Sequence, residues 1–442
     1  MIDKKIYIQY VIIVFLWLLA NTVSSSIGFI ALFISIFFIL KGRDIDVVRF
    51  IFFFLPNIRI LDVLGFTSGI NILLIVCSLK IIFSYTSEYG DNHLKTLIDK
   101  RASFVALFVF VIELSHAFLS TTTLSGILFN ATNIALDILA GITLLNKGWS
   151  IEKFRTVVIS FSIGVFSSAV VFVVANPDIV RLIMKSAYRF GAYGTDPNYL
   201  SVYVVLSMAG ILYISVYEKV HIYEFLILVL LAVVGLLTAS KMCLLSMISI
   251  FSIYFIVTFI QGKWKQLGKV ILGLFPIVLV GIFAFKDYLI IFWYKLLDRF
   301  SNTSFTSGRN NLFDYYMRHI WDDNTSFLWG RGVGYFSFYQ SKGAEYVAHN
   351  TYLDFLLSWG IIGFISFILL MIFAYKEKIN IKNHNAIDYI MIIILSVMLL
   401  SLSCMSSDMF WFIVPYSFIP LTMYPELIML SKGDRSVENY KE

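Results

Sequence analysis

Charged residues are scarce in this chain of 442 residues, of which 14% are Asp, Glu, Lys or Arg and 59% are hydrophobic. A soluble domain carries about 25% charged residues. The deficit excludes an ordinary water-soluble protein and favours a chain that is surrounded by lipid. The backbone of such a chain must satisfy its own hydrogen bonds, which leaves helices or a closed barrel as its structure.

Cysteine is also rare, and the three that occur (Cys77, Cys243 and Cys404) are odd in number and far apart, so no disulfide framework is expected. The His, Cys and Asp residues show no spacing typical of metal ligands, and we predict neither a metal site nor a cofactor. The net charge of +6 is spread over short loops instead of forming a basic stripe, so nucleic acid is not an expected partner.

Long continuous apolar runs fill most of the chain, and they predict transmembrane helices because barrel strands are short and alternate in polarity. We therefore expect an all-α polytopic membrane protein, with residues 1–442 forming one integral membrane domain of about 12–14 spans. The third run, near 45–60, contains Arg49, Pro56 and Arg59, and either lies along the membrane interface or enters only partway.

The expected runs lie near 5–20, 23–40, 45–60, 69–85, 102–119, 124–145, 156–175, 197–216, 222–238, 242–260, 267–285, 350–374, 386–406 and 408–430. Short basic loops stay in the cytoplasm, and here they alternate so that both termini are cytoplasmic. The one long polar segment, 286–349, is then extracytoplasmic. Residues 310–320 within it have the pattern of an amphipathic helix, so the loop is expected to bear short helices.

Short extracytoplasmic segments normally lack basic residues, yet four fall there. They are Arg181, Lys185, Arg189 and Lys241. Binding of an anion explains such an exception to the topology rule. For Arg181 and Lys185, extension of the side chain to lipid headgroups explains it equally well. Arg189 lies among glycines and polar residues that include Asn198, and there we favour a functional role.

The long segment ends in His349 and Asn350, directly before a new hydrophobic helix. Neighbouring positive charge and a helix N-terminus favour a neutral imidazole, which is the form that a general base requires. The alternative is structural: His349 only bonds at the interface, and Asn350 or Thr351 caps the helix. The segment also carries arginines, whose planar fork suits phosphate. They are Arg299, Arg309, Arg318 and Arg331.

Two further patterns have structural explanations that we weigh against functional ones. Gly330, Gly332 and Gly334 allow sharp turns and a close approach to a ligand, and turn formation alone is the preferred explanation. Glu113 and His116 lie in one apolar run, with Asp137 in the next. These three could line a proton path, but we favour a role in helix packing.

Several segments, taken in order, resemble the O-antigen ligase/polymerase superfamily over about residues 189–363. That superfamily has a long outer loop that ends in a His-Asn pair before a helix. Segments 194–200 and 237–241 also resemble its sequence pattern. The segments of the loop region are Thr306-Ser307-Gly308-Arg309, Leu328-Trp329-Gly330-Arg331-Gly332, Ala348-His349-Asn350-Thr351-Tyr352-Leu353 and Trp359-Gly360-Ile361-Ile362-Gly363.

The resemblance implies a glycosyltransferase at the outer face of the bacterial cytoplasmic membrane, with undecaprenyl-pyrophosphate-linked oligosaccharide as substrate. His349 matches the loop histidine that assists the acceptor hydroxyl. Arg189 and Arg309 match the residues that bind pyrophosphate, with Arg299 or Arg318 in support. One departure is Lys241, which stands where the superfamily commonly has an arginine that binds phosphate in bidentate fashion.

Our first hypothesis is an O-antigen or similar surface-glycan polymerase, with Arg331, Asn198 and Asn350 as further substrate-binding candidates. A chain-length regulator and a flippase are its expected partners, in the lipid bilayer. One alternative within the superfamily is O-antigen ligase, which transfers the glycan to lipid A–core. The alternative from another class is a transporter or flippase of lipid-linked sugars, for which paired broken helices at mid-membrane are expected.

Overall fold

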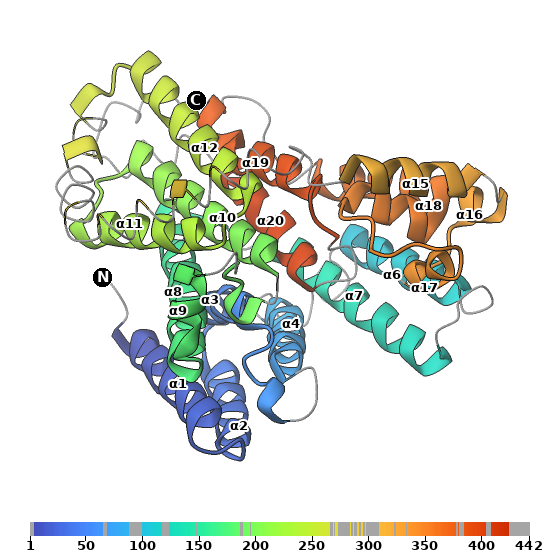
Figure 1. Ribbon diagram of the computed structural model, residues 1–442, viewed down its shortest axis with the longest axis horizontal. Coiled ribbons are helices and arrows are strands. Elements are labelled where there is room, and N and C mark those ends of the chain that lie inside the picture. Colours follow the sequence, from blue (N-terminus) through green and yellow to red (C-terminus); the bar gives the residue numbers. More distant parts are fainter. Residues whose placement is uncertain are drawn as a thin grey trace.

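The computed structural model describes residues 4–64, 69–87, 100–116, 123–146, 148–185, 189–194, 196–265, 309–321, 324–332, 334–376, 384–403 and 408–423, with a few single positions between 268 and 297 and residue 379. Throughout these ranges the regular secondary structure is helical and contains no strand (Figure 1). The predicted all-α class is therefore confirmed.

Six of the described helices are long and apolar enough to cross a membrane, which confirms a multi-pass membrane protein. They are α1 (Lys4–Thr22), α7 (Leu124–Leu144), α8 (Ile151–Ala175), α10 (Pro197–Tyr217), α12 (Lys241–Ile260) and α18 (Thr351–Tyr375). Further helices pack among them, namely α2 (Ile27–Lys41), α4 (Gly69–Ser87), α6 (Lys100–Ser115), α11 (Ile222–Leu237), α19 (Ile390–Leu399) and α20 (Asp408–Thr422). Most of the run predicted near 267–285 lies outside the described residues.

The third predicted run forms α3 (Asp44–Phe54), and every residue from Asp46 to Phe54 is buried. α3 packs against α4 and α8 inside the protein, so this segment is a helix enclosed by other helices. Its charge is satisfied internally, because Arg49 Nη1 lies 3.3 Å from Asp46 Oδ1. Eleven helical residues rise about 16 Å, roughly half a bilayer core, which agrees with the alternative of partial entry.

Three helices of the bundle begin at side-chain caps that share one end of the molecule. Asp196 Oδ1 accepts a hydrogen bond from Asn198 N at 2.6 Å, and Pro197 occupies the first helical position of α10. Ser240 caps α12 through Cys243 N at 3.3 Å, and Asn350 caps α18 through Leu353 N at 3.1 Å. The polar residues that start these helices are thereby held in fixed positions.

A lobe formed by residues 309–348 has its own small core, which packs onto the first turns of α18. It contains α15 (Arg309–Trp321), α16 (Asn324–Trp329) and α17 (Tyr335–Gln340), and α15 is the amphipathic helix predicted at 310–320. Its buried side chains include Tyr316 and Tyr339 from the lobe and Leu357 from α18. α15, α16 and α18 lie together at the right of Figure 1.

The lobe is also joined to α18 through the backbone, at a break in that helix. Gly360 has φ 62°, and the amides of Arg331 and Gly332 bond the carbonyls of Leu357 (2.9 Å) and Ser358 (2.8 Å). A Cβ on Gly330 would lie 2.2 Å from the Ser358 carbonyl oxygen, so only glycine fits there. Close packing of the turn accounts for this glycine, in agreement with the structural explanation preferred for the Gly-x-Gly-x-Gly run.

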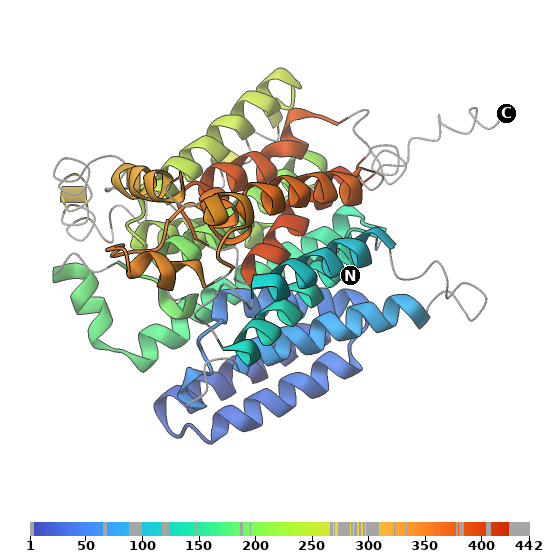
Figure 2. The same ribbon diagram turned by 90° about the vertical axis from the view of Figure 1, so that its right-hand side faces the viewer.

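The bundle has two ends that differ in composition, and we call them the site end and the opposite end. At the site end, Tyr199 Oη bonds the Ser403 carbonyl, and Thr351 Oγ1 bonds the Leu402 carbonyl at 2.8 Å. At the opposite end, Lys80 Nζ bonds the Gly42 carbonyl at 2.6 Å, and Arg155 bonds Glu218. Figure 2 shows the bundle helices running side by side between these ends, with α9 (Asp178–Lys185) at the left.

Candidate active site

Arg189 is the fixed point of the candidate site. Its Nη2 donates to Asn198 Oδ1 at 2.8 Å, and its Nε donates to the Thr238 carbonyl at 3.3 Å. Ser240 Oγ donates to the same Asn198 oxygen at 3.0 Å. Three polar segments that are distant in sequence therefore meet here, at the N-termini of α10 and α12. The partial positive charge of helix N-termini adds to the attraction for an anion.

Lys241 contributes a second positive charge to this region. It is the first residue of α12 and follows Ser240 directly, and it is 8% exposed. Its charge therefore lies within the protein instead of extending to lipid headgroups. Because a buried ammonium group is costly unless polar or anionic groups surround it, its position supports a role inside the site.

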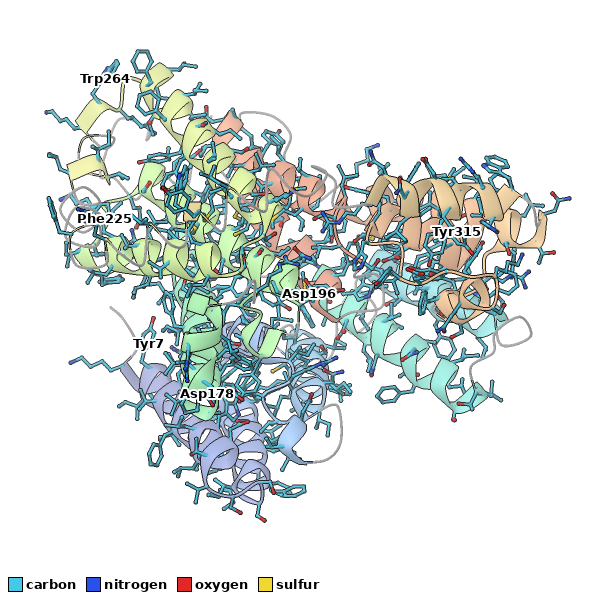
Figure 3. All side chains as sticks on the ribbon, viewed as in Figure 1. Tyr7, Asp178, Asp196, Phe225, Trp264 and Tyr315 are labelled. Carbon is cyan, nitrogen blue, oxygen red and sulfur yellow. The ribbon has the colours of Figure 1, made fainter. Side chains whose placement is uncertain are left out.

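His349 lies in the electrostatic field of this cluster. The pKa of its imidazole is lowered from 6.5, first because burial disfavours the charged form and then because Arg309 and Arg189 repel a proton. Asp196 acts in the opposite direction and raises the pKa. In Figure 3, Asp196 is labelled near the middle of the molecule, between the bundle and the lobe. The direction of this shift favours the neutral form of the imidazole near neutral pH.

Backbone strain is concentrated around the same site. Among the described residues, three that are not glycine have a left-handed φ: Ala192 (48°), Ala239 (47°) and His349 (48°). Ala239 directly precedes Ser240, His349 directly precedes Asn350, and Ala192 lies three residues after Arg189. Such conformations cost on the order of 1–3 kcal/mol each and gather at functional sites, where the surrounding structure enforces them.

A buried carboxylate holds the chain behind His349. Asp354 accepts a hydrogen bond from Tyr335 Oη and another from Ser403 Oγ at 3.1 Å. The phenolic oxygen of Tyr335 in turn accepts the amide of Ala348 at 3.4 Å. This chain of bonds connects the lobe, the start of α18 and the α19–α20 connection. It fixes the backbone that immediately precedes the imidazole.

The other predicted residues divide into three groups. Asn350 is the cap of α18, so of the two cap candidates it is this residue and not Thr351 that fills the position. Arg331 is tied to the lobe, because its Nε bonds Ser326 Oγ at 2.7 Å and its guanidinium carbon lies 3.9 Å from the Phe338 ring centroid. Arg299 lies outside the described residues.

Arg318 and Arg309 occupy the same helix but different sides of it. They are nine residues apart on α15, which is about 13 Å along the axis and half a rotation around it. The positive charge of Arg309 lowers the pKa of His349, whereas Arg318 is exposed near the end of the helix. The structure therefore places Arg309, and not Arg318, with the cluster of Arg189, Asn198 and His349.

Glu113 and His116 contact the lobe and the start of α18. Glu113 accepts a hydrogen bond from Trp359 Nε1, and His116 Nε2 lies 2.8 Å from the Trp329 carbonyl oxygen. A Cβ on Gly332 would lie 2.9 Å from the Cβ of His116, so the loop passes directly over this side chain. These contacts agree with the preferred role in packing.

Sequence reasoning assigned no role to two residues of the cluster, Asp196 and Ser240. Both precede helices as caps, and the Asp196-Pro197 and Ser240-Lys241 pairs are local signals of a helix start. What those signals could not reveal is that both caps bond Asn198, since this depends on how α10 and α12 pack.

Comparison with known proteins adds no relative: no family model, curated protein or solved structure matches the chain.

Proposed function

We propose that this protein is a membrane glycosyltransferase of the O-antigen polymerase type. It transfers a growing glycan from undecaprenyl pyrophosphate to a lipid-linked repeat unit at the outer face of the bacterial cytoplasmic membrane. A single observation carries the proposal. Arg189, Arg309 and His349 come from three distant segments, and the charges of both arginines act on the imidazole and lower its pKa.

Each group has a role in the proposed reaction. The acceptor hydroxyl attacks the anomeric carbon, a C–O bond forms, and the bond from that carbon to the pyrophosphate oxygen breaks. The hydroxyl proton passes to the neutral imidazole of His349, as in general-base catalysis. Arg189 and Arg309, with Lys241 nearby, bind the departing pyrophosphate. Guanidinium forks suit its oxygens and stabilise the negative charge as it develops.

The way in which Arg189 is held favours catalysis over simple attraction of an anion. Asn198 Oδ1 and the Thr238 carbonyl orient the guanidinium, and these oxygens carry no formal charge. An oriented donor needs no rearrangement when charge develops in the transition state. The strained backbone at His349 similarly fixes a catalytic group before the substrate arrives.

The break in α18 argues against a transporter, although broken helices are typical of transporter sites. At the break, the carbonyls of Leu357 and Ser358 accept hydrogen bonds from Arg331 and Gly332 of the lobe. Backbone groups that would otherwise coordinate a substrate are thus occupied by the protein itself. The break serves to dock the lobe.

The test is reconstitution of purified protein with a synthetic undecaprenyl-pyrophosphate-linked repeat unit. A polymerase lengthens this substrate into a ladder of products without any other acceptor. A ligase leaves its length unchanged and transfers it only when lipid A–core is added. Absence of transfer under both conditions, with the substrate bound, would overturn the proposal. Release of undecaprenyl pyrophosphate in proportion to the bonds formed is the matched control.

A further inference from the structure

Arg189 borders a second compartment that the proposed reaction has not used. It is a pocket of about 330 Å³ between the ends of α1, α3 and α8 and the segment before α10. Its volume lies at the lower end of the range for small-molecule sites, about 300–1,000 Å³. The lining residues are Asn21, Arg59, Asp62, Val63, Phe172, Arg189, Gly191, Ala192, Tyr193 and Pro197.

The walls of this pocket are rigid. Arg59 N donates to the Tyr193 carbonyl at 3.2 Å, and Tyr193 Oη donates to Asn21 Oδ1 at 2.8 Å. The amide of Asn21 bonds the Ile60 carbonyl at 3.1 Å, which connects the end of α1 to the segment after α3. Tyr193 and Phe172 meet edge to face, with ring centroids 5.2 Å apart. The pocket is therefore formed by the fold in advance of any ligand.

We infer that this pocket binds a sugar ring of the lipid-linked glycan, next to the bond that is transferred. Its mixed lining suits a neutral, hydroxyl-rich ring: carboxylate and guanidinium groups can bond hydroxyls, and the aromatic rings offer apolar surface. The inference rests on the proposed function, because the sugar lies beside Arg189 only if Arg189 binds the pyrophosphate to which that sugar is attached.

A second phosphate group is the competing occupant, and Asp62 argues against it. A carboxylate in the wall accepts hydrogen bonds from hydroxyls but repels phosphate oxygens. Arg59 Nε lies 3.9 Å from Asp62 Oδ2, so part of the positive charge of Arg59 is already directed to that carboxylate. Arg309 and Arg189 both act on the imidazole of His349. In this pocket Asp62 offsets the charge of Arg59, and Arg189, which borders both compartments, is the other basic residue of the lining.

Two probes separate the sugar from the phosphate. One is undecaprenyl pyrophosphate without sugar, and the other is the lipid-linked repeat unit extracted from the producing cells. Asp62→Asn should weaken binding of the second probe about tenfold to a hundredfold, because a charge-assisted hydrogen bond is lost. Binding of the sugar-free probe should stay at the wild-type value. Asp178→Asn on the exposed face of α9 is the matched control and should change neither.

Val63→Phe tests the same pocket by filling it, and it does not depend on a change of charge. It should weaken binding of the lipid-linked repeat unit while leaving that of undecaprenyl pyrophosphate intact. Weaker binding of both probes by Asp62→Asn or Val63→Phe would show an extension of the phosphate site and overturn the sugar assignment. Unchanged binding of both would overturn it as well.

The proposed function fails in a different way in the same assay. Arg309→Ala should weaken the binding of both probes, because each carries the pyrophosphate. If the wild-type protein bound neither probe, or if Arg309→Ala bound both normally, the assignment of the catalytic cluster would fall. The effect of Asp62→Asn on the sugar-bearing probe alone therefore reports on the pocket alone.

Discussion

Arg155 at the opposite end of the bundle and Arg189 at the site end are held in different ways. At the opposite end, Arg155 forms ion pairs with Glu218 at 2.7 Å and with Glu224 at 2.9 Å. At the site end, Arg189 is oriented by the amide oxygen of Asn198 and the carbonyl of Thr238. A carboxylate neutralises a guanidinium, whereas an amide or carbonyl oxygen orients it. The first arrangement is that of a structural ion pair, and the second fits the anion-binding role that we propose for Arg189.

The histidines follow the same division. His384, at the opposite end, has its Nδ1 3.1 Å from Asp388 Oδ2, and Tyr217 donates to the other oxygen of that carboxylate at 2.6 Å. His349, at the site end, is instead under the influence of two arginines, which lower its pKa. The same kind of side chain is thus paired with a carboxylate at one end and placed beside positive charge at the other.

Exchanging His349 for alanine should have the largest effect on activity. His349→Ala removes the proposed base and should slow glycan transfer about a hundredfold to ten-thousandfold, while donor binding is retained. The assay uses purified protein and the lipid-linked repeat unit. His384→Ala is the control from the opposite end, and it should lower thermal stability but keep the rate per folded molecule. Equal rate losses in the two variants would contradict the claim that His349 takes part in the reaction and His384 only stabilises the fold.

Loss of Arg155 should lower the stability of the fold. Arg155→Met leaves the buried carboxylate of Glu224 without its partner, which costs about 3–5 kcal/mol. The midpoint of thermal unfolding in detergent should fall accordingly. Adding Glu224→Gln to the same chain should restore much of the loss, since no uncompensated charge remains. An unchanged midpoint in the single variant would show that this ion pair does not stabilise the fold.

Arg309 tests whether the geometry of the fork matters or only its charge. Arg309→Lys keeps the charge but loses bidentate contact with pyrophosphate. The rate should fall about tenfold to a hundredfold, which corresponds to one charge-assisted hydrogen bond. Arg318→Lys, on the other side of the same helix, should retain wild-type polymer ladders. A wild-type ladder from Arg309→Lys would assign Arg309 a structural role.

Tyr335 should show the smallest effect. Tyr335→Phe removes the hydroxyl that bonds Asp354 and accepts the amide of Ala348, so the backbone before His349 is held less firmly. A hydrogen bond of this kind contributes about 1 kcal/mol, which corresponds to a several-fold decrease in kcat at unchanged KM. Tyr315→Phe, whose hydroxyl bonds the Lys342 carbonyl on the lobe surface, is the control. An increase in KM alone would indicate a role in binding instead of positioning.

Local patterns in the sequence predicted the helices well. The apolar runs and the amphipathic pattern at 310–320 depend on residues near one another in the chain, and α15 appears where it was expected. The segment near 45–60 was harder, because Arg49 and Pro56 suggested an interface position. Asp46 pairs with Arg49 within the segment, but burial of α3 also depends on α8, whose Ser160 accepts from Arg49 Nε at 3.4 Å. The packing against α8 cannot be read from the segment itself.

The candidate site was predictable in its residues but not in its geometry. Arg189 stood out because it breaks the charge rule, His349 because it directly precedes a helix after the long loop, and Arg309 because of the resemblance to the superfamily. Their convergence, the sharing of Asn198 by Arg189 and Ser240, and the pocket lined by Asp62 all arise from helix packing. Arg331 was a candidate from the same polar segment as Arg309, yet its guanidinium bonds Ser326 within the lobe. The sequence did not distinguish the two arginines.

The dependence of the transfer rate on pH tests the central claim most directly. His349 must be neutral to accept a proton, and its pKa is lowered from 6.5, so the wild-type rate should stay level from about pH 8 down to mildly acidic pH. It should then fall as the imidazole becomes protonated. His349→Gln should be slower throughout and should lack this acidic fall. If the wild-type protein and His349→Gln gave profiles of the same shape, His349 would not be the base, and the account of the site would be wrong.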